Sequence, residues 1–169
     1  FKQRIPWLLL LMISATFTSM IITNFEGYIR ALAGGAVLIA FIPMLTDTGG
    51  NAGSQASVSV IRGLALGDIE LRDWFRVLWK EIRVAAICGI TLASCNFVKL
   101  LLIDRMLLRN DDVTPLIALI VCLTLLAAVF IAKTVGCLLP LFAKRLGFDP
   151  AVMASPFITT IVDALALLA

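Results

Sequence analysis

Long apolar runs separated by short charged links dominate this chain of 169 residues. A bilayer with a hydrocarbon core about 30 Å thick is crossed by roughly 20 helical residues, and several of these runs reach that length. Apolar residues make up 61% of the chain and charged residues 15%, whereas a soluble domain has about 45–50% and about 25%. A water-soluble domain is therefore not expected, and neither is a disordered chain. The sequence predicts an all-α integral membrane protein that contacts the lipid bilayer.

Five membrane-spanning helices are expected, joined by polar turns. The long second run contains Pro43 and a polar, glycine-rich stretch, which is tolerated at membrane depth only where it faces protein or water. The third helix should begin with an interfacial segment that carries Trp74 and Trp79, because tryptophan prefers the headgroup level. A polar loop is expected over residues 104–112. The predicted spans are 6–24, 31–66, 77–102, 113–142 and 149 to the end of the chain.

The basic residues predict the orientation of the chain. With the N-terminus in the cytoplasm, nine basic side chains fall inside and three fall outside, which satisfies the positive-inside rule. The net charge of +3 is modest, and the basic residues cluster on one side of the predicted membrane. No nucleic-acid partner is therefore expected. The nine are Lys2, Arg4, Arg62, Arg72, Arg76, Lys80, Arg83, Lys144 and Arg145, and the three are Arg30, Arg105 and Arg109.

Histidine is absent from the sequence. This excludes histidine-ligated zinc or haem sites and hydrolases whose catalytic triad contains histidine. Cys88, Cys95, Cys122 and Cys137 lie in apolar runs and form no CxxC pair, so each is expected to be a small, buried apolar residue. Function must therefore be sought among the oxygen-bearing side chains.

Asp163 is the most informative of these side chains, because it lies in an otherwise apolar helix. It follows Asp149 by 14 residues, about 21 Å along a helix, and a carboxylate at that depth is costly unless water or a cation stabilises it. Ser155, Thr159 and Asp163 recur every four residues, so they share one helical face. A stripe of oxygen atoms that ends in a carboxylate suits a hard cation.

Lys133 offers a structural alternative for this acid. It lies inside the fourth span at a depth similar to that of Asp163, and a salt bridge between them would give both residues a structural role. Asp47, midway along the second span, is a rival partner for Lys133. The sequence favours a cation pathway for Asp163 and a pairing role for Lys133, and it leaves both alternatives open.

A second polar surface is expected along residues 47–55. The small residues of this stretch let two helices approach closely, which is a packing role. They also expose backbone carbonyls that a hydrated cation can use, and on composition the two interpretations are balanced. The residues expected to line a pore are Asp47, Gly49, Gly50, Asn51 and Gly53.

Charge balance favours a homodimer. One Asp163 supplies one negative charge, and a two-fold axis at the fifth helices would supply the second charge that a divalent cation needs. A proton- or Na⁺-coupled exchanger is the alternative within transport, since an intramembrane Asp beside a Lys is a common basis for a proton relay. An intramembrane aspartyl protease using Asp47 and Asp163 is a remote alternative, because no glycine-rich turn follows Asp163 to bring two carboxylates together.

Two motifs resemble the MgtE family of magnesium channels. The first is TGGNAGSQ at residues 48–55, followed by IRGLA at 61–65 and Asp68; the second is DPA at 149–151, followed by SPF at 155–157 and Asp163. The resemblance implies a homodimer whose pore lies at the dimer interface, between the second and fifth helices. It implies a channel, not an enzyme, that conducts Mg²⁺ into the cytoplasm down its electrochemical gradient.

The resemblance also implies roles for individual residues. Asp163 would hold a largely hydrated ion, and Thr159 would offer its backbone carbonyl. Ser155 stands where relatives carry Asn, and Asp149 would help to bind regulatory Mg²⁺ at the cytoplasmic mouth. The sequence does not determine how strongly Mg²⁺ is preferred over Mn²⁺, Co²⁺ or Ca²⁺.

The same family suggests the setting of the chain. Residues 1–169 are expected to form one transmembrane pore domain in the bacterial inner membrane, with the N-terminus in the cytoplasm. The chain is expected to be a fragment that lacks the cytosolic N-terminal and CBS domains of full-length relatives. Such a fragment should lack most of the gating that senses Mg²⁺.

Overall fold

The computed structural model describes residues 5–32, 34–150, 161 and 164. Its long helices are α1 (Ile5–Arg30), α2 (Gly35–Leu66), α3 (Trp74–Lys99) and α4 (Pro115–Arg145). A short 3-10 helix, η1 (Leu71–Asp73), precedes α3, and a π-helical segment, η2 (Leu100–Leu107), extends it. The predicted all-α class is confirmed for these residues.

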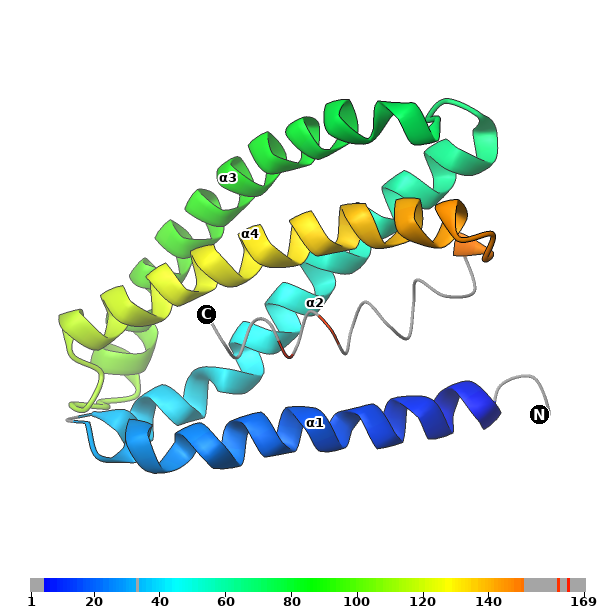
Figure 1. Ribbon diagram of the computed structural model, residues 1–169. Helices are drawn as coiled ribbons and strands as arrows, with labels where there is room; N and C mark the ends of the chain where they lie inside the picture. Colours follow the sequence, from blue (N-terminus) through cyan, green and yellow to red (C-terminus); the bar gives the residue numbers. More distant parts are fainter. Residues whose placement is uncertain (1–4, 33, 151–160, 162–163, 165–169) are drawn as a thin grey trace.

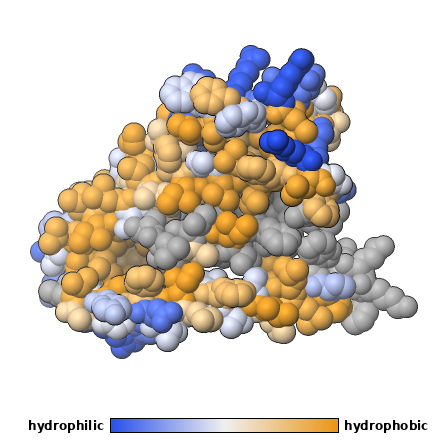
Figure 2. All heavy atoms as spheres, in the orientation of Figure 1, coloured by the Kyte–Doolittle hydropathy of each residue, from blue (hydrophilic) through white to orange (hydrophobic). Residues whose placement is uncertain are grey.

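The helices run back and forth so that their links gather at two ends (Figure 1). The α2–α3 link, the end of α4 and the start of α1 lie at one end, and the α1–α2 and η2–α4 links lie at the other. Hydrophobic residues cover most of the surface between these ends, and hydrophilic residues gather toward them (Figure 2). This distribution is typical of a membrane-spanning protein, because charged groups are costly in the hydrocarbon core of a bilayer.

Three stretches of the described chain are long and apolar enough to cross a membrane: Leu8–Arg30, Leu71–Leu107 and Pro115–Arg145. Helix α2 has 32 residues, but its polar, glycine-rich middle keeps it out of this group. The expected fifth helix lies mostly outside the described residues. The plan of five spans is therefore supported for three helices and stays a prediction for the other two.

Helices α2, α3 and α4 form the packed core, and α1 lies beside α2. Buried side chains of α4, including Val121, Leu125 and Val129, pack with Leu45 of α2 and with Leu100 at the start of η2. By contrast, none of the α1 side chains that the structure describes is buried. The apolar surface of α1 is thus free to face lipid.

The third helix continues further than the sequence predicts. A loop is expected from residue 104, but helical structure extends to Leu107 as η2. Hydrogen bonds in a π-helix join residues five apart, and this register brings Lys99 and Asp104 together, with Lys99 Nζ 2.8 Å from Asp104 Oδ2. The predicted loop over residues 104–112 is therefore wrong for residues 104–107, which are helical, and is confirmed for residues 108–112.

The cysteines follow the prediction only in part. All four are free thiols, and Cys122 and Cys137 are buried as expected. Cys88 is half-buried, and Cys95 is exposed on the surface of α3. The error arises because an apolar run in a membrane protein can face lipid, so an apolar neighbourhood in sequence does not imply burial in the protein.

Candidate functional site

The polar middle of α2 is helical throughout and has two different faces. Residues four apart share one side of a helix, and this spacing separates small side chains from polar ones. We call the buried side the small face and the exposed side the polar stripe. The small face consists of Gly49, Gly50, Ala52, Gly53, Ala56 and Ser57, and the polar stripe consists of Asp47, Asn51, Gln55 and Ser59.

The small face brings α4 to within backbone distance of α2. A Cβ atom added to Gly136 of α4 would overlap the backbone carbonyl of Gly53, so only glycine fits at position 136. Membrane helices associate through such close packing because lipid supplies no hydrophobic driving force between them. The packing interpretation of the glycine stretch is therefore supported at Gly53.

The polar stripe keeps its oxygen atoms at the surface of the chain. Asn51 Nδ2 donates a hydrogen bond to Asp47 Oδ2 at 3.2 Å, and Ser59 Oγ donates to the carbonyl oxygen of Gln55 at 2.9 Å. Both bonds run along α2. Of the predicted pore-lining residues, Asp47 and Asn51 lie on this stripe, whereas the three glycines lie on the small face.

The second predicted constellation is described only at its first residue. Asp149 is exposed just after α4, and Pro150 is already helical, which agrees with an acid at the N-cap and proline at N1. Ser155, Thr159 and Asp163 lie outside the described residues, so their cation site stays a prediction. Within the described part of the chain, no group of three or more Cys, Asp or Glu side chains is arranged to hold a metal ion.

Lys133 has a partner that the sequence reasoning missed. Its Nζ lies 3.8 Å from Oε2 of Glu81 in α3, and the two residues are only 5% and 7% exposed. Of the two partners that the sequence offered for Lys133, Asp47 is wrong, because it lies on the exposed stripe. The other, Asp163, lies outside the described residues. A signal was present in the sequence, since Glu81 is the only acidic residue between Trp74 and Ile103.

Fold and site together define an α-helical membrane protein in which one polar, small-faced helix is packed among apolar helices. Residues 42–169 match the family MgtE, described as divalent cation transporter. This match covers most of the chain, and it confirms the resemblance carried by the two sequence motifs. The chain belongs to the MgtE family of divalent cation transporters.

Individual relatives agree with this assignment. The chain is 37% identical to the magnesium transporter MgtE of Thermus thermophilus over 165 residues, which is 98% of the chain and 34% of the relative. It is 30% identical to the magnesium transporter MgtE of Enterococcus faecalis over 167 residues, which is 99% of the chain and 34% of the relative. It is 28% identical to the magnesium transporter MgtE of Bacillus subtilis over 170 residues, which is 98% of the chain and 34% of the relative. The chain thus spans about a third of the length of these curated relatives, which are named as transporters and not as enzymes.

Proposed function

We propose that this chain forms the membrane-embedded pathway of a Mg²⁺ transporter. The observation that carries the proposal is the polar stripe of α2, where Asp47, Asn51 and Gln55 are exposed. Polar and charged side chains within a membrane face protein or water, because exposure to lipid is costly. A stripe that requires water, in a family of divalent cation transporters, suits the passage of a hydrated ion.

The chemistry of the stripe supports magnesium as the transported ion. Mg²⁺ releases its water reluctantly and is commonly bound through one or two carboxylates with several waters retained. Amide and hydroxyl groups on the stripe can bond those waters, and the carboxylate of Asp47 attracts the charge. We infer that Asp163 supplies the selective charge deeper in the pathway, and that the ion moves into the cytoplasm down its electrochemical gradient.

We also propose that the pathway lies between two copies of the chain. A stripe on the surface of one protomer is enclosed when a two-fold axis brings a second stripe to face it. The same axis provides two copies of Asp163, which together balance one divalent ion. From the distribution of basic residues, we further propose that the N-terminus lies on the cytoplasmic side of the inner membrane.

The test is Mg²⁺ influx into liposomes that carry the protein at its full natural length. Asp163→Asn removes a charge and keeps the shape of the side chain, and Asp111→Asn does the same in the exposed link before α4. We expect wild type and Asp111→Asn to conduct and Asp163→Asn to lose most of its flux, with all three folded as dimers. Equal flux in Asp163→Asn and wild type would place the cation site elsewhere.

One observation favours a coupled exchanger as the second candidate. The buried Glu81–Lys133 pair is the kind of intramembrane acid and base that proton relays use. A channel conducts Mg²⁺ when proton and Na⁺ gradients are collapsed, whereas an exchanger requires one of them. Flux that needs an imposed gradient, and that is lost in Lys133→Met while the protein stays folded, would favour the exchanger.

A further inference from the structure

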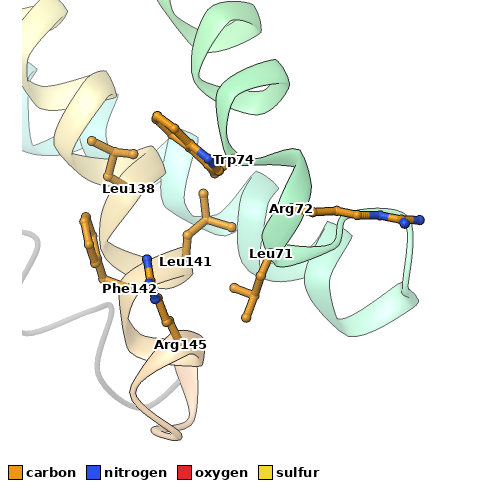
Figure 3. Close-up of a pocket in the computed structure, with 7 residues that line it drawn as sticks. All are labelled: Leu71, Arg72, Trp74, Leu138, Leu141, Phe142 and Arg145. Carbon is orange, nitrogen blue, oxygen red and sulfur yellow. The ribbon is translucent and has the colours of Figure 1, made fainter.

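A cavity of about 450 Å³ lies between the start of α3 and the last turns of α4 (Figure 3). Its wall is mostly apolar, with two arginine side chains completing it. It is separate from the polar stripe of α2, none of whose residues lines it. We call it the Arg145 cavity, and it is lined by Leu71, Arg72, Trp74, Leu138, Leu141, Phe142 and Arg145.

The Arg145 cavity has a charged end and an apolar depth. Leu138 precedes Arg145 by seven residues, about 10 Å along a helix, and Arg145 is the last residue of the span Pro115–Arg145. The cavity therefore reaches from the end of a membrane-spanning helix towards its middle. Trp74 beside it is 51% exposed, and tryptophan prefers the level of the lipid headgroups.

The two arginines differ in whether their guanidinium group is already paired with an acid. Arg72 extends away from the cavity in Figure 3, and its Nε lies 2.9 Å from Oε2 of Glu70. Arg145 instead lies close to Phe142 on the cavity side. None of the ion pairs of the described chain includes Arg145. Its guanidinium is thus available to an anion.

We propose that the Arg145 cavity binds one anionic phospholipid per chain. The phosphate lies on the guanidinium of Arg145, because arginine is well matched to phosphate, and an acyl chain follows Leu138 and Leu141 towards the membrane centre. Basic pockets between membrane helices are known sites for anionic headgroups. The charged mouth and apolar depth match the two ends of a phospholipid, and a free phosphate ion would leave the apolar part unused.

The test uses native mass spectrometry of the purified, delipidated protein at its full natural length, to which phosphatidylglycerol or phosphatidylcholine is added back. We expect tight binding of one phosphatidylglycerol per chain. Arg145→Gln should weaken it about fivefold, the effect of one basic residue at a membrane surface. Leu138→Trp, which fills the cavity and keeps the charge, should weaken it as well. Arg109→Gln removes a charge from the η2–α4 link, at the opposite end of the helices from the cavity, and should have no effect.

Several results would overturn the proposal. If phosphatidylglycerol binding is unchanged in both Arg145→Gln and Leu138→Trp, the cavity is not the lipid site. The lipid would then bind elsewhere, or a second copy of the chain would fill the cavity. Equal binding of phosphatidylcholine would remove the anionic requirement. Displacement of the lipid by inorganic phosphate, with Leu138→Trp unaffected, would show a simple anion site. If Arg145→Gln fails to fold, Arg145→Lys and Leu138→Trp decide the question, because the first keeps the charge and the second blocks the acyl chain.

Discussion

Lys133 of α4 and Glu81 of α3 form an ion pair inside the helical core, with Nζ and Oε2 3.8 Å apart. Burying either charge alone costs several kcal/mol, so each residue requires the other. Lys133 lies three residues before Gly136, where α4 meets the backbone of α2. The pair therefore ties α3 to the helix that supports the polar stripe, and it neutralises a positive charge that would repel a cation.

The first prediction concerns the coupling of this pair. Lys133→Met and Glu81→Met should each lower the free energy of unfolding by about 3–5 kcal/mol, because each leaves an unpaired buried charge. The double variant should recover most of that loss, since it leaves no charge unpaired. Reversible denaturant unfolding in detergent measures the four free energies of this double-mutant cycle.

The exposed pair Arg30–Glu26 of α1 provides the matched control for that cycle. It joins residues four apart on a helix surface, where such pairs are worth about 0.3–0.5 kcal/mol. The same cycle with methionine at both positions should therefore show little coupling. Additive losses at Lys133 and Glu81 would contradict the role of the buried pair.

The second prediction follows from the contact between Gly136 and Gly53. Gly136→Val should lower the free energy of unfolding by at least about 1–3 kcal/mol, because overpacking forces the two backbones apart. Gly27→Ala in α1 is the control, since no atom lies within 4 Å of its added Cβ. It should be neutral or stabilising by up to about 1 kcal/mol, as alanine is the better helix former. A Gly136→Val protein with wild-type stability would show that the helices do not meet there.

The sequence predicted the parts of the fold that depend on local patterns. The apolar runs placed α2 and α4 within about four residues of their observed bounds, because a membrane span needs a length of apolar helix that is visible in the sequence. The end of α1 was predicted wrongly: the helix continues to Arg30, six residues past the expected end at residue 24. The end of the second span at Leu66 was also predicted, and there Gly67 has a φ of +77°, a conformation that favours glycine. The two motifs of the resemblance were sufficient to identify the family.

The sequence could not predict which helices face one another. The partner of Lys133 depends on how α3 and α4 are rotated about their axes. The sequence therefore offered Asp163 and Asp47 as candidates, whereas the structure places Glu81 beside Lys133. The glycines of α2 were balanced between pore and packing for the same reason. The π-helical register of η2 also escaped prediction, because the pairing of Lys99 with Asp104 involves a spacing of five residues that an α-helix does not bring together.

The third prediction concerns the start of α4. Thr114 is the N-cap, and its Oγ1 accepts a hydrogen bond from the backbone nitrogen of Ile117 at 3.3 Å. Thr114→Ala should lower the free energy of unfolding by about 1 kcal/mol, because the backbone N–H of Ile117 loses its acceptor. Thr114→Ser keeps a hydroxyl group and should retain most of the wild-type stability. Thermal unfolding in detergent distinguishes the two variants. Equal losses would show that the threonine methyl group, and not the cap, is what stabilises this end.

The last prediction tests the polar stripe as a cation path. Asp47→Asn should lower Mg²⁺ influx about tenfold at low ionic strength, which is the effect of one charge on a divalent ion held about 6 Å away by its water shell. The loss should shrink as salt is raised, because mobile ions screen the carboxylate. Proteoliposome flux at two salt concentrations measures both effects. Asp111→Asn removes an exposed acid from the link before α4, which is not part of the stripe, and should leave the flux unchanged. If Asp47→Asn conducts like wild type at low salt, the ion does not pass along this face of α2.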